Sequence, residues 1–126
     1  GQLDSAFISS MGKLLLAYLD DDELDKILAT TGPITLSHGS FVDERSLRAI
    51  LFKVREIGYA IDDGEFVEGV RAVSAPIKAH TGKVIAALTV AGSSVRMTDD
   101  RMPEIIRQVV EAAERVSFEL GAPALS

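Results

Sequence analysis

Apolar side chains recur at steps of three and four residues in several stretches of the chain, which is the spacing of one face of a helix. This pattern predicts helices over residues 9–19, 43–57 and 102–120. A shorter helix is predicted between Asp20, whose side chain can cap its start, and the Gly32–Pro33 pair, which ends it. The chain is therefore expected to be rich in amphipathic helices.

Capping residues and one glycine refine these helices. Gly58 is expected to end the helix that precedes it, and Thr98, Asp99 and Asp100 are candidate caps for the last helix. Gly12 lies inside the first predicted helix, where a glycine weakens the structure. We therefore expect it near the start of that helix, or where another part of the backbone comes close.

The period changes in the second half of the chain. β-Branched and small apolar residues dominate residues 70–79 and 84–91, and the polar turn at 80–83 contains a glycine, which predicts a β-hairpin. Residues 84–91 are apolar on both faces, which predicts a central strand covered on two sides. Pro76 removes a ladder donor from the other strand, which favours a bulge or an unpaired side there.

A third short strand is predicted over residues 59–61, and residues 34–40 are predicted to be a loop or a short edge segment. Helices thus occupy both ends of the chain and strands its middle. This order favours an α+β fold in which helices flank an antiparallel sheet. A chain of 126 residues is near the usual size of one domain.

Composition and charge exclude several classes of function. Against 13 Lys and Arg the chain carries 19 Asp and Glu, and a net charge of −6 repels the phosphates of nucleic acid. The absence of cysteine excludes disulfides, Cys-based zinc sites and thiol nucleophiles. No apolar run reaches the roughly 20 residues that span a bilayer, and no export signal is visible. We expect a cytoplasmic chain that does not bind membranes.

Candidate chemistry is sparse. His38 and His80 stand in separate polar turns and are expected to be solvated rather than to bind a metal. Four carboxylates are concentrated within seven residues: Asp62, Asp63, Glu65 and Glu68. We interpret them as a solvated turn, with a cation site or a general acid–base pair as the alternative. No metal, cofactor or catalytic residue is predicted.

The start of the first helix is a second candidate. Ser9 to Lys13 share only the Gly-Lys pair with a phosphate loop, but the free N–H groups at a helix start can attract an anion. Lys13 itself is expected to lie on the surface. No arrangement of nucleophile and base is evident, and the chain is predicted not to be an enzyme.

Across nearly its whole length the chain resembles the C-terminal effector-binding domain of IclR-type bacterial transcription regulators. The resemblance rests on the order and spacing of six blocks, namely residues 10–17, 20–24, 54–65, 69–77, 82–92 and 96–101. It implies a GAF-like α+β fold over residues 1–121, with 122–126 as a tail. It also implies a homo-dimer or tetramer, and contact with DNA only through an N-terminal winged helix-turn-helix that these 126 residues lack.

The resemblance further implies where a small carboxylic-acid effector binds. The implied ligand-binding residues are Ser10, Met11, Gly12, Asp62, Val70, Ala72, Thr89 and Ala91. Met11, Ala72 and Ala91 differ from the residues of relatives that bind small keto acids, so we expect a drier pocket and a larger or more aromatic acid. Two other hypotheses remain, a stand-alone GAF-like ligand-binding module and a small hydrolase that uses Asp62, Glu65 and a histidine.

Overall fold

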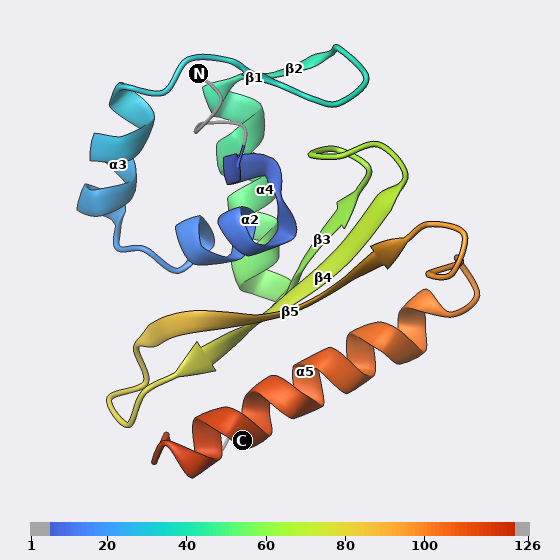
Figure 1. Ribbon diagram of the computed structural model, residues 1–126. Coiled ribbons are helices and arrows are strands. Elements are labelled where there is room, and N and C mark those ends of the chain that lie inside the picture. Colours follow the sequence, from blue (N-terminus) through green and yellow to red (C-terminus); the bar gives the residue numbers. More distant parts are fainter. Residues whose placement is uncertain (1–5, 123–126) are drawn as a thin grey trace.

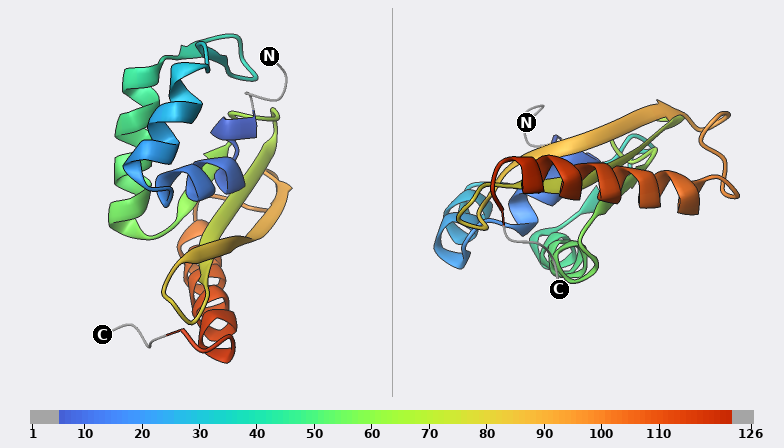
Figure 2. Two further views of the ribbon diagram at one scale, coloured as in Figure 1. Left: turned by 90° about the vertical axis from the view of Figure 1, so that its left-hand side faces the viewer. Right: turned by 90° about the horizontal axis from the view of Figure 1, so that it is seen from below.

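A three-stranded antiparallel sheet separates two layers of helix in the computed structural model, which describes residues 6–122 (Figure 1). One face of the sheet is covered by α5 and the other by α2 and its neighbours (Figure 2). In chain order the elements are η1 (Ala6–Ile8), α2 (Ser10–Ala17), α3 (Asp21–Ala29), β1 (Ile34–Thr35), β2 (Phe41–Val42), α4 (Glu44–Ile57), β3 (Ala60–Asp63), β4 (Val70–Lys78), β5 (Val84–Ser93) and α5 (Met102–Glu119). The α+β prediction is confirmed.

The sheet has the order β3-β4-β5, so the central strand is β4. The prediction that residues 84–91 form a central strand is wrong for the described residues, because β5 pairs with β4 alone. Its side chains are half-buried or exposed, and Ile85 is 57% exposed. A run of apolar residues shows that both faces of a strand are apolar. It does not determine how many strands pair with that strand.

Pro76 pairs with Ala87 of β5, and the irregularity in the ladder lies just beyond it, between Ile77 and Lys78. The shorter strand β3 pairs with β4 only as far as Ser74. Pro76 therefore stands where β4 has a single neighbour, which is where a strand tolerates a residue without an N–H group.

Side chains and backbone turns set the helix ends. Asp20 and Asp43 cap α3 and α4 by accepting bonds from the N–H groups three residues on, at 2.9 and 2.8 Å. Gly58 ends α4 in the left-handed conformation, with φ of 84°. The cap predicted for the last helix is wrong, because α5 begins at Met102 and is preceded by Arg101, with no side-chain cap bond. The first-turn Pro103 has no N–H group that would need one.

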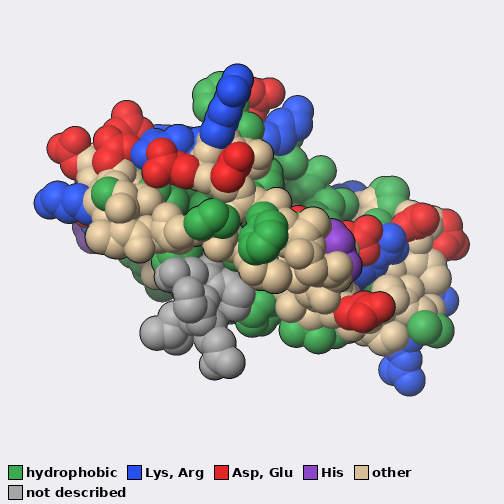
Figure 3. Space-filling model, turned by 90° about the horizontal axis from the view of Figure 1, so that it is seen from above, with side chains coloured by type: hydrophobic (Ala, Val, Ile, Leu, Met, Phe, Trp, Pro, Cys, Tyr) green, Lys and Arg blue, Asp and Glu red, His purple; other side chains and the backbone are tan. Residues whose placement is uncertain are grey.

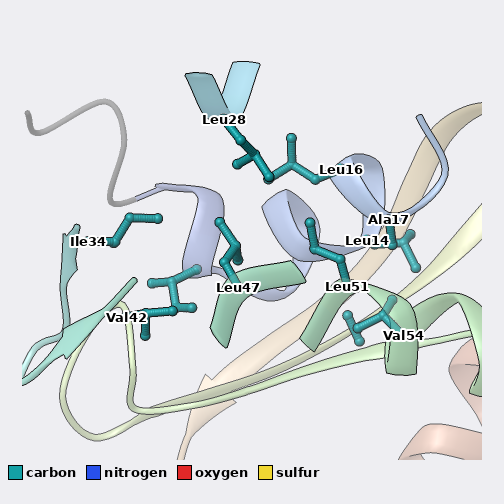
Figure 4. Close-up of a cluster of buried hydrophobic side chains, with 11 residues drawn as sticks. Leu14, Leu16, Ala17, Leu28, Ile34, Val42, Leu47, Leu51 and Val54 are labelled. Atoms are coloured by element: carbon teal, nitrogen blue, oxygen red, sulfur yellow. The ribbon is translucent and has the colours of Figure 1, made fainter. Parts of the chain in front are cut away.

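Two apolar cores lie on opposite faces of the sheet. The larger one joins α2, α3, α4 and the small β1–β2 hairpin (Figure 4); its buried side chains are Ile8, Leu14, Leu16, Ala17, Leu28, Ile34, Val42, Leu47, Leu51, Val54 and Ala60. The smaller one lies between β4 and α5 and contains Val73, Ala75, Met97, Val109 and Ala113. The hairpin supplies Ile34 and Val42 to the first core, where we predicted a loop or a short edge segment.

Gly12 lies at the third position of α2, against the backbone of η1. A Cβ atom at this position would meet the Ala6 carbonyl oxygen and would lie 2.9 Å from the Cα of Phe7. The expectation of a close backbone approach is confirmed. At the other end of the chain Ala122 is buried, and residues 123–126 of the predicted tail lie outside the described residues. Between residues 6 and 122 no helix is both long and apolar enough to cross a membrane.

Candidate functional site

The residues implied as ligand-binding gather on the face of the sheet that α2 covers. The register places Asp62, Ala72 and Ala91 in one row across the three strands, and Ser74 and Thr89 in the next row. Residues that alternate along a strand share one face, so both rows point to the same side. The sheet therefore brings together positions from three separate stretches of sequence.

Three hydroxyl groups form a continuous chain from α2 to β5. The Oγ atoms of Ser10 and Ser74 are 2.8 Å apart, and the Ser74 Oγ lies 2.7 Å from the Oγ1 of Thr89. Ser10 and Ser74 are fully buried, and Thr89 is half-buried. Hydroxyl groups both donate and accept, so this chain satisfies itself and can also turn donors toward an acceptor beside it.

Ser74 was not among the residues predicted for the site. The strand pattern did contain an indication of its role. Ser74 is a polar residue two positions from Ala72, and it therefore lies on the same face of the strand. Its polarity has a reason only when Ser10 and Thr89 are placed beside it. A buried hydroxyl without such partners would cost stability.

Asp62 is buried at the end of β3, with 3% of its surface exposed. Its Oδ1 accepts the N–H groups of Glu65 and Phe66 at 2.9 and 3.3 Å. Burial raises the pKa of this carboxyl, and the two amide bonds partly oppose the rise. Asp62 thus shapes the loop after β3 and leaves its second oxygen available for a donor.

Lys13 lies in the interior, and the prediction of a surface lysine is wrong. It is 4% exposed, and its Nζ donates to the carbonyl of Ile61 and to the Oε1 of Glu65, the latter at 2.9 Å. The buried ammonium is tolerated because a carbonyl oxygen of β3 and a carboxylate of the following loop both accept hydrogen bonds from it. The Gly-Lys pair therefore serves packing and polar contact, with Gly12 against η1 and Lys13 against β3.

The remaining predicted residues lie around this centre with different exposures. Met11 is 45% exposed, and Ala91 at the edge of the sheet is exposed. Val70 is half-buried and also lines a hollow of about 220 Å³ beside the loop after β3. The N–H of Gly12 already donates to the Oγ of Ser9 at 3.1 Å. The start of α2 therefore has one donor fewer for a ligand than the sequence implied.

Three of the four clustered carboxylates, Asp62, Asp63 and Glu65, each have a different structural partner. Asp63 receives bonds from Arg71, which also reaches the carboxylate of Asp99 at 2.6 Å, and this holds the pKa of Asp63 below its ordinary value. Glu65 pairs with Lys13, and Asp62 accepts backbone bonds. Among the described residues no group of three or more histidines and carboxylates is placed to hold a metal ion. His38 and His80 are both exposed.

Comparison with known proteins identifies the family. The family described as "Bacterial transcriptional regulator IclR C-terminal" matches residues 1–118. The chain belongs to the IclR family. Because the relatives of this family named below are transcriptional regulators and repressors, the prediction that the chain is not an enzyme is supported, and the hydrolase hypothesis is not.

Curated relatives are identical to this IclR chain at about a third of the aligned positions. It is 30% identical over 121 residues to the HTH-type transcriptional regulator KdgR of Escherichia coli (strain K12), covering 96% of the chain and 46% of KdgR. It is 34% identical over 116 residues to the transcriptional repressor AllR of the same strain, covering 92% of the chain and 43% of AllR. The chain thus spans less than half the length of these relatives.

Solved IclR-family structures have the same fold. The C-terminal domain of E. coli KdgR matches with a TM-score of 0.80 and 30% identity, over 91% of this chain and 70% of that one. The Agobacterium tumefaciens repressor BlcR matches with a TM-score of 0.82 and 26% identity, over 94% of this chain and 48% of that one. Both comparisons support the α+β arrangement of the described residues.

Proposed function

We propose that this chain is the effector-sensing and oligomerising domain of an IclR-type transcription regulator, and that it binds a small organic acid. The observation that supports this best is the convergence of Ser10, Ser74 and Thr89 in a row of hydroxyls beside Ala72. Ligand sites combine an apolar lining with a few converging polar groups, and the face between α2 and the sheet has this composition.

The hydroxyl chain favours a carboxylate as the polar group of the ligand. The two bonds within the chain use two of the three hydroxyl protons, so one proton is left to donate to an anion. A hydrogen bond to a charged group is stronger than one between neutral groups. Asp62 at the same face would repel a second acidic group and would accept a bond from a ligand hydroxyl or amine. A monocarboxylate with a hydroxylated or aromatic skeleton fits these requirements better than a dicarboxylate or a sugar phosphate.

The site lies close to the surface on the side of β5. Met11 and Ala91 are exposed beside it, so a ligand larger than a keto acid can extend past them toward solvent. The ligand-binding residues of the proposal are the eight named from the sequence together with Ser74.

Output to DNA is proposed to pass through a part of the regulator outside these 126 residues. On the face shown in Figure 3 acidic and basic side chains are interspersed, without the basic stripe of a duplex-binding surface. A cytoplasmic dimer or tetramer would transmit the effector signal as a shift between arrangements of its effector domains. The exposed Ile85 and Val90 of β5 supply apolar surface for such assembly.

A panel of small monocarboxylic acids, each with its primary amide, tests the site by thermal shift. A ligand bound only by the folded state raises the melting temperature. We expect at least one acid to stabilise the chain and its amide to bind at least about tenfold more weakly, since hydrogen bonds to a charged group are worth roughly 1.5–3 kcal/mol. Equal binding of acid and amide by calorimetry would contradict the carboxylate assignment.

The variant Ala72→Phe tests whether the acid binds on this face of the sheet. The larger side chain at this buried position should displace the acid found in the panel and abolish its binding, in a protein that still folds. Ala86→Phe, on the opposite face of β5, is the matched control and should leave affinity unchanged. Unchanged affinity in folded Ala72→Phe would move the site elsewhere. The hypothesis of a stand-alone ligand-binding module makes the same prediction. The gene of the full-length protein distinguishes the two hypotheses, because it shows whether a DNA-binding part accompanies this domain.

A further inference from the structure

The second half of β4 has an open side. Because β3 pairs with β4 only as far as Ser74, residues 75–78 have a single strand neighbour, β5. The N–H of Lys78 donates instead to the Oγ of Ser117 in α5, at 2.9 Å. A cavity of about 640 Å³ lies along this open side, which is within the range of small-molecule sites.

Three helices end at this cavity. One side is lined by Tyr18, which ends α2, and by Ile57 and Gly58 at the end of α4. The other side is lined by the second half of α5, from Val110 to Phe118. The right-hand view of Figure 2 shows α4 end-on, with α5 running across the molecule. The lining includes apolar residues such as Pro76 and Val110 and the aromatic residues Tyr18 and Phe118.

Two cations lie near the Tyr18 ring, and one of them, Lys78, lines the cavity. The Nζ of Lys78 lies 5.9 Å and the guanidinium of Arg55 lies 6.0 Å from the centre of the Tyr18 ring. Helix carboxyl ends attract cations, which accounts for Arg55 in the last turn of α4. Neither Lys78 nor Arg55 has a carboxylate within 4.0 Å in the part of the chain that the structure describes.

The lining contains two carboxylates, Glu111 and Glu114, and two cations, Lys78 and Arg115. Glu111 is held by two bonds from Arg107, at 2.8 and 2.9 Å. Glu114 is exposed and has the cation Arg115 beside it in the lining, also exposed and without a carboxylate within 4.0 Å among residues 6–122. Lys78 is therefore a half-buried cation of the lining that has no carboxylate within 4.0 Å among residues 6–122.

We propose that this cavity is a second ligand site, separate from the effector site, and that it binds an amphipathic organic anion. The flat apolar body of the ligand lies between Tyr18 and Phe118, and its acidic group meets Lys78. Pro76 stands on the open side of β4, and a proline at a sheet edge disfavours the addition of another strand. The occupant is therefore a small molecule rather than an extended peptide.

Two fluorescent probes of nearly the same shape test the proposal. One is 8-anilinonaphthalene-1-sulfonate, an aromatic anion, and the other is N-phenyl-1-naphthylamine, which lacks the sulfonate. Phe118→Ala removes an aromatic side chain from the cavity lining and should weaken the binding of both probes about threefold or more. Phe52→Ala is the matched control, because Phe52 is 73% exposed on α4 and is not in the cavity lining. Unchanged affinity of the anionic probe in Phe118→Ala would overturn the proposal.

Charge is tested separately. Lys78→Gln should weaken the sulfonate probe about threefold to fivefold and leave the neutral probe unchanged, while Lys83→Gln in the hairpin turn should affect neither. An equal effect of Lys78→Gln on both probes would overturn the anion assignment. The variant Thr89→Val lies in β5 at the proposed effector site, and it should leave the affinities of both probes unchanged. Loss of the anionic probe in Thr89→Val alone would place it at the effector site and overturn the second site.

Discussion

Lys13 and Glu65 form an ion pair that ties α2 to the loop after β3, with 2.9 Å between Nζ and Oε1. The lysine is 4% exposed and the glutamate 28%, so one partner is buried and the other reaches solvent. The same ammonium donates to the carbonyl of Ile61, one residue before Asp62. The pair therefore connects the start of α2 to the loop that Asp62 shapes, across one side of the proposed effector site.

Lys13→Met should destabilise the folded chain by about 1–3 kcal/mol. The substitution leaves the carbonyl of Ile61 and the carboxylate of Glu65 without their donor, and the partial exposure of Glu65 reduces the cost below that of a fully buried pair. Urea denaturation measures the free energy of unfolding. Lys53→Met is the control, because the Lys53 side chain is 67% exposed and its pair with Glu56 spans 4.0 Å. Equal effects of the two substitutions would contradict the structural role of Lys13.

Ser74→Ala should cost about 1–2 kcal/mol. It removes the middle hydroxyl of the chain, so Ser10, which is 2% exposed, loses its partner for the Oγ. Ser94→Ala is a matched control, since the Ser94 hydroxyl has no hydrogen-bond partner within the described residues, and it should change the free energy of unfolding by less than about 0.5 kcal/mol. A Ser74→Ala protein as stable as Ser94→Ala would show that the chain of hydroxyls contributes nothing to folding.

Gly12→Ala should destabilise the chain by about 2 kcal/mol or more, even though alanine is the better helix former. The added Cβ would press against the backbone of Ala6 and Phe7, which cannot move aside as a flexible side chain does. Gly32→Ala has open space around its Cβ and should be neutral or slightly stabilising. Thermal unfolding of both variants makes the comparison, and a neutral Gly12→Ala would rule out the close approach of η1.

Asp62 should make an unusual contribution to the pH dependence of stability. Burial raises its pKa in the folded chain above the unfolded value of about 3.9, so the folded state binds the proton more tightly. Its contribution is therefore most favourable at acid pH and is lost as pH rises through the raised pKa. Carboxyls with lowered pKa values, such as Asp63 and Glu104, contribute in the opposite direction.

The variant Asp62→Asn isolates this contribution. Its free energy of unfolding relative to the natural chain should increase as pH rises from about 4 toward 7, because the natural chain alone has a buried carboxyl to ionise. Urea denaturation across this range, without ligand, measures the difference. A difference that stays constant with pH would mean that burial does not perturb Asp62.

Local sequence determined the helices and their ends to a large extent. Asp20 and Gly58 act through contacts within four residues of themselves, so capping chemistry was sufficient to predict them. Apolar spacing predicted that the next helix starts at Asp43, which caps α4. The β-hairpin of β4 and β5 was predictable for the same reason, since its turn and both strands are contiguous. The α5 cap was the exception, because three candidate polar residues stood close together and none of them caps the helix.

Tertiary structure alone decided the position of β5 at the edge, the burial of Lys13 and the chain from Ser10 through Ser74 to Thr89. Each depends on partners far apart in sequence, 48 to 64 residues for the contacts of Lys13 and Ser10. The number of neighbours of a strand follows from the order of the sheet, and a lysine becomes tolerable inside only where a carbonyl and a carboxylate meet it. The sequence determined the residues of the proposed effector site only through the family resemblance, and alternation puts Thr89 and Ala91 on one face of β5. The polar contacts among the site residues required the fold, because their partners lie on different elements.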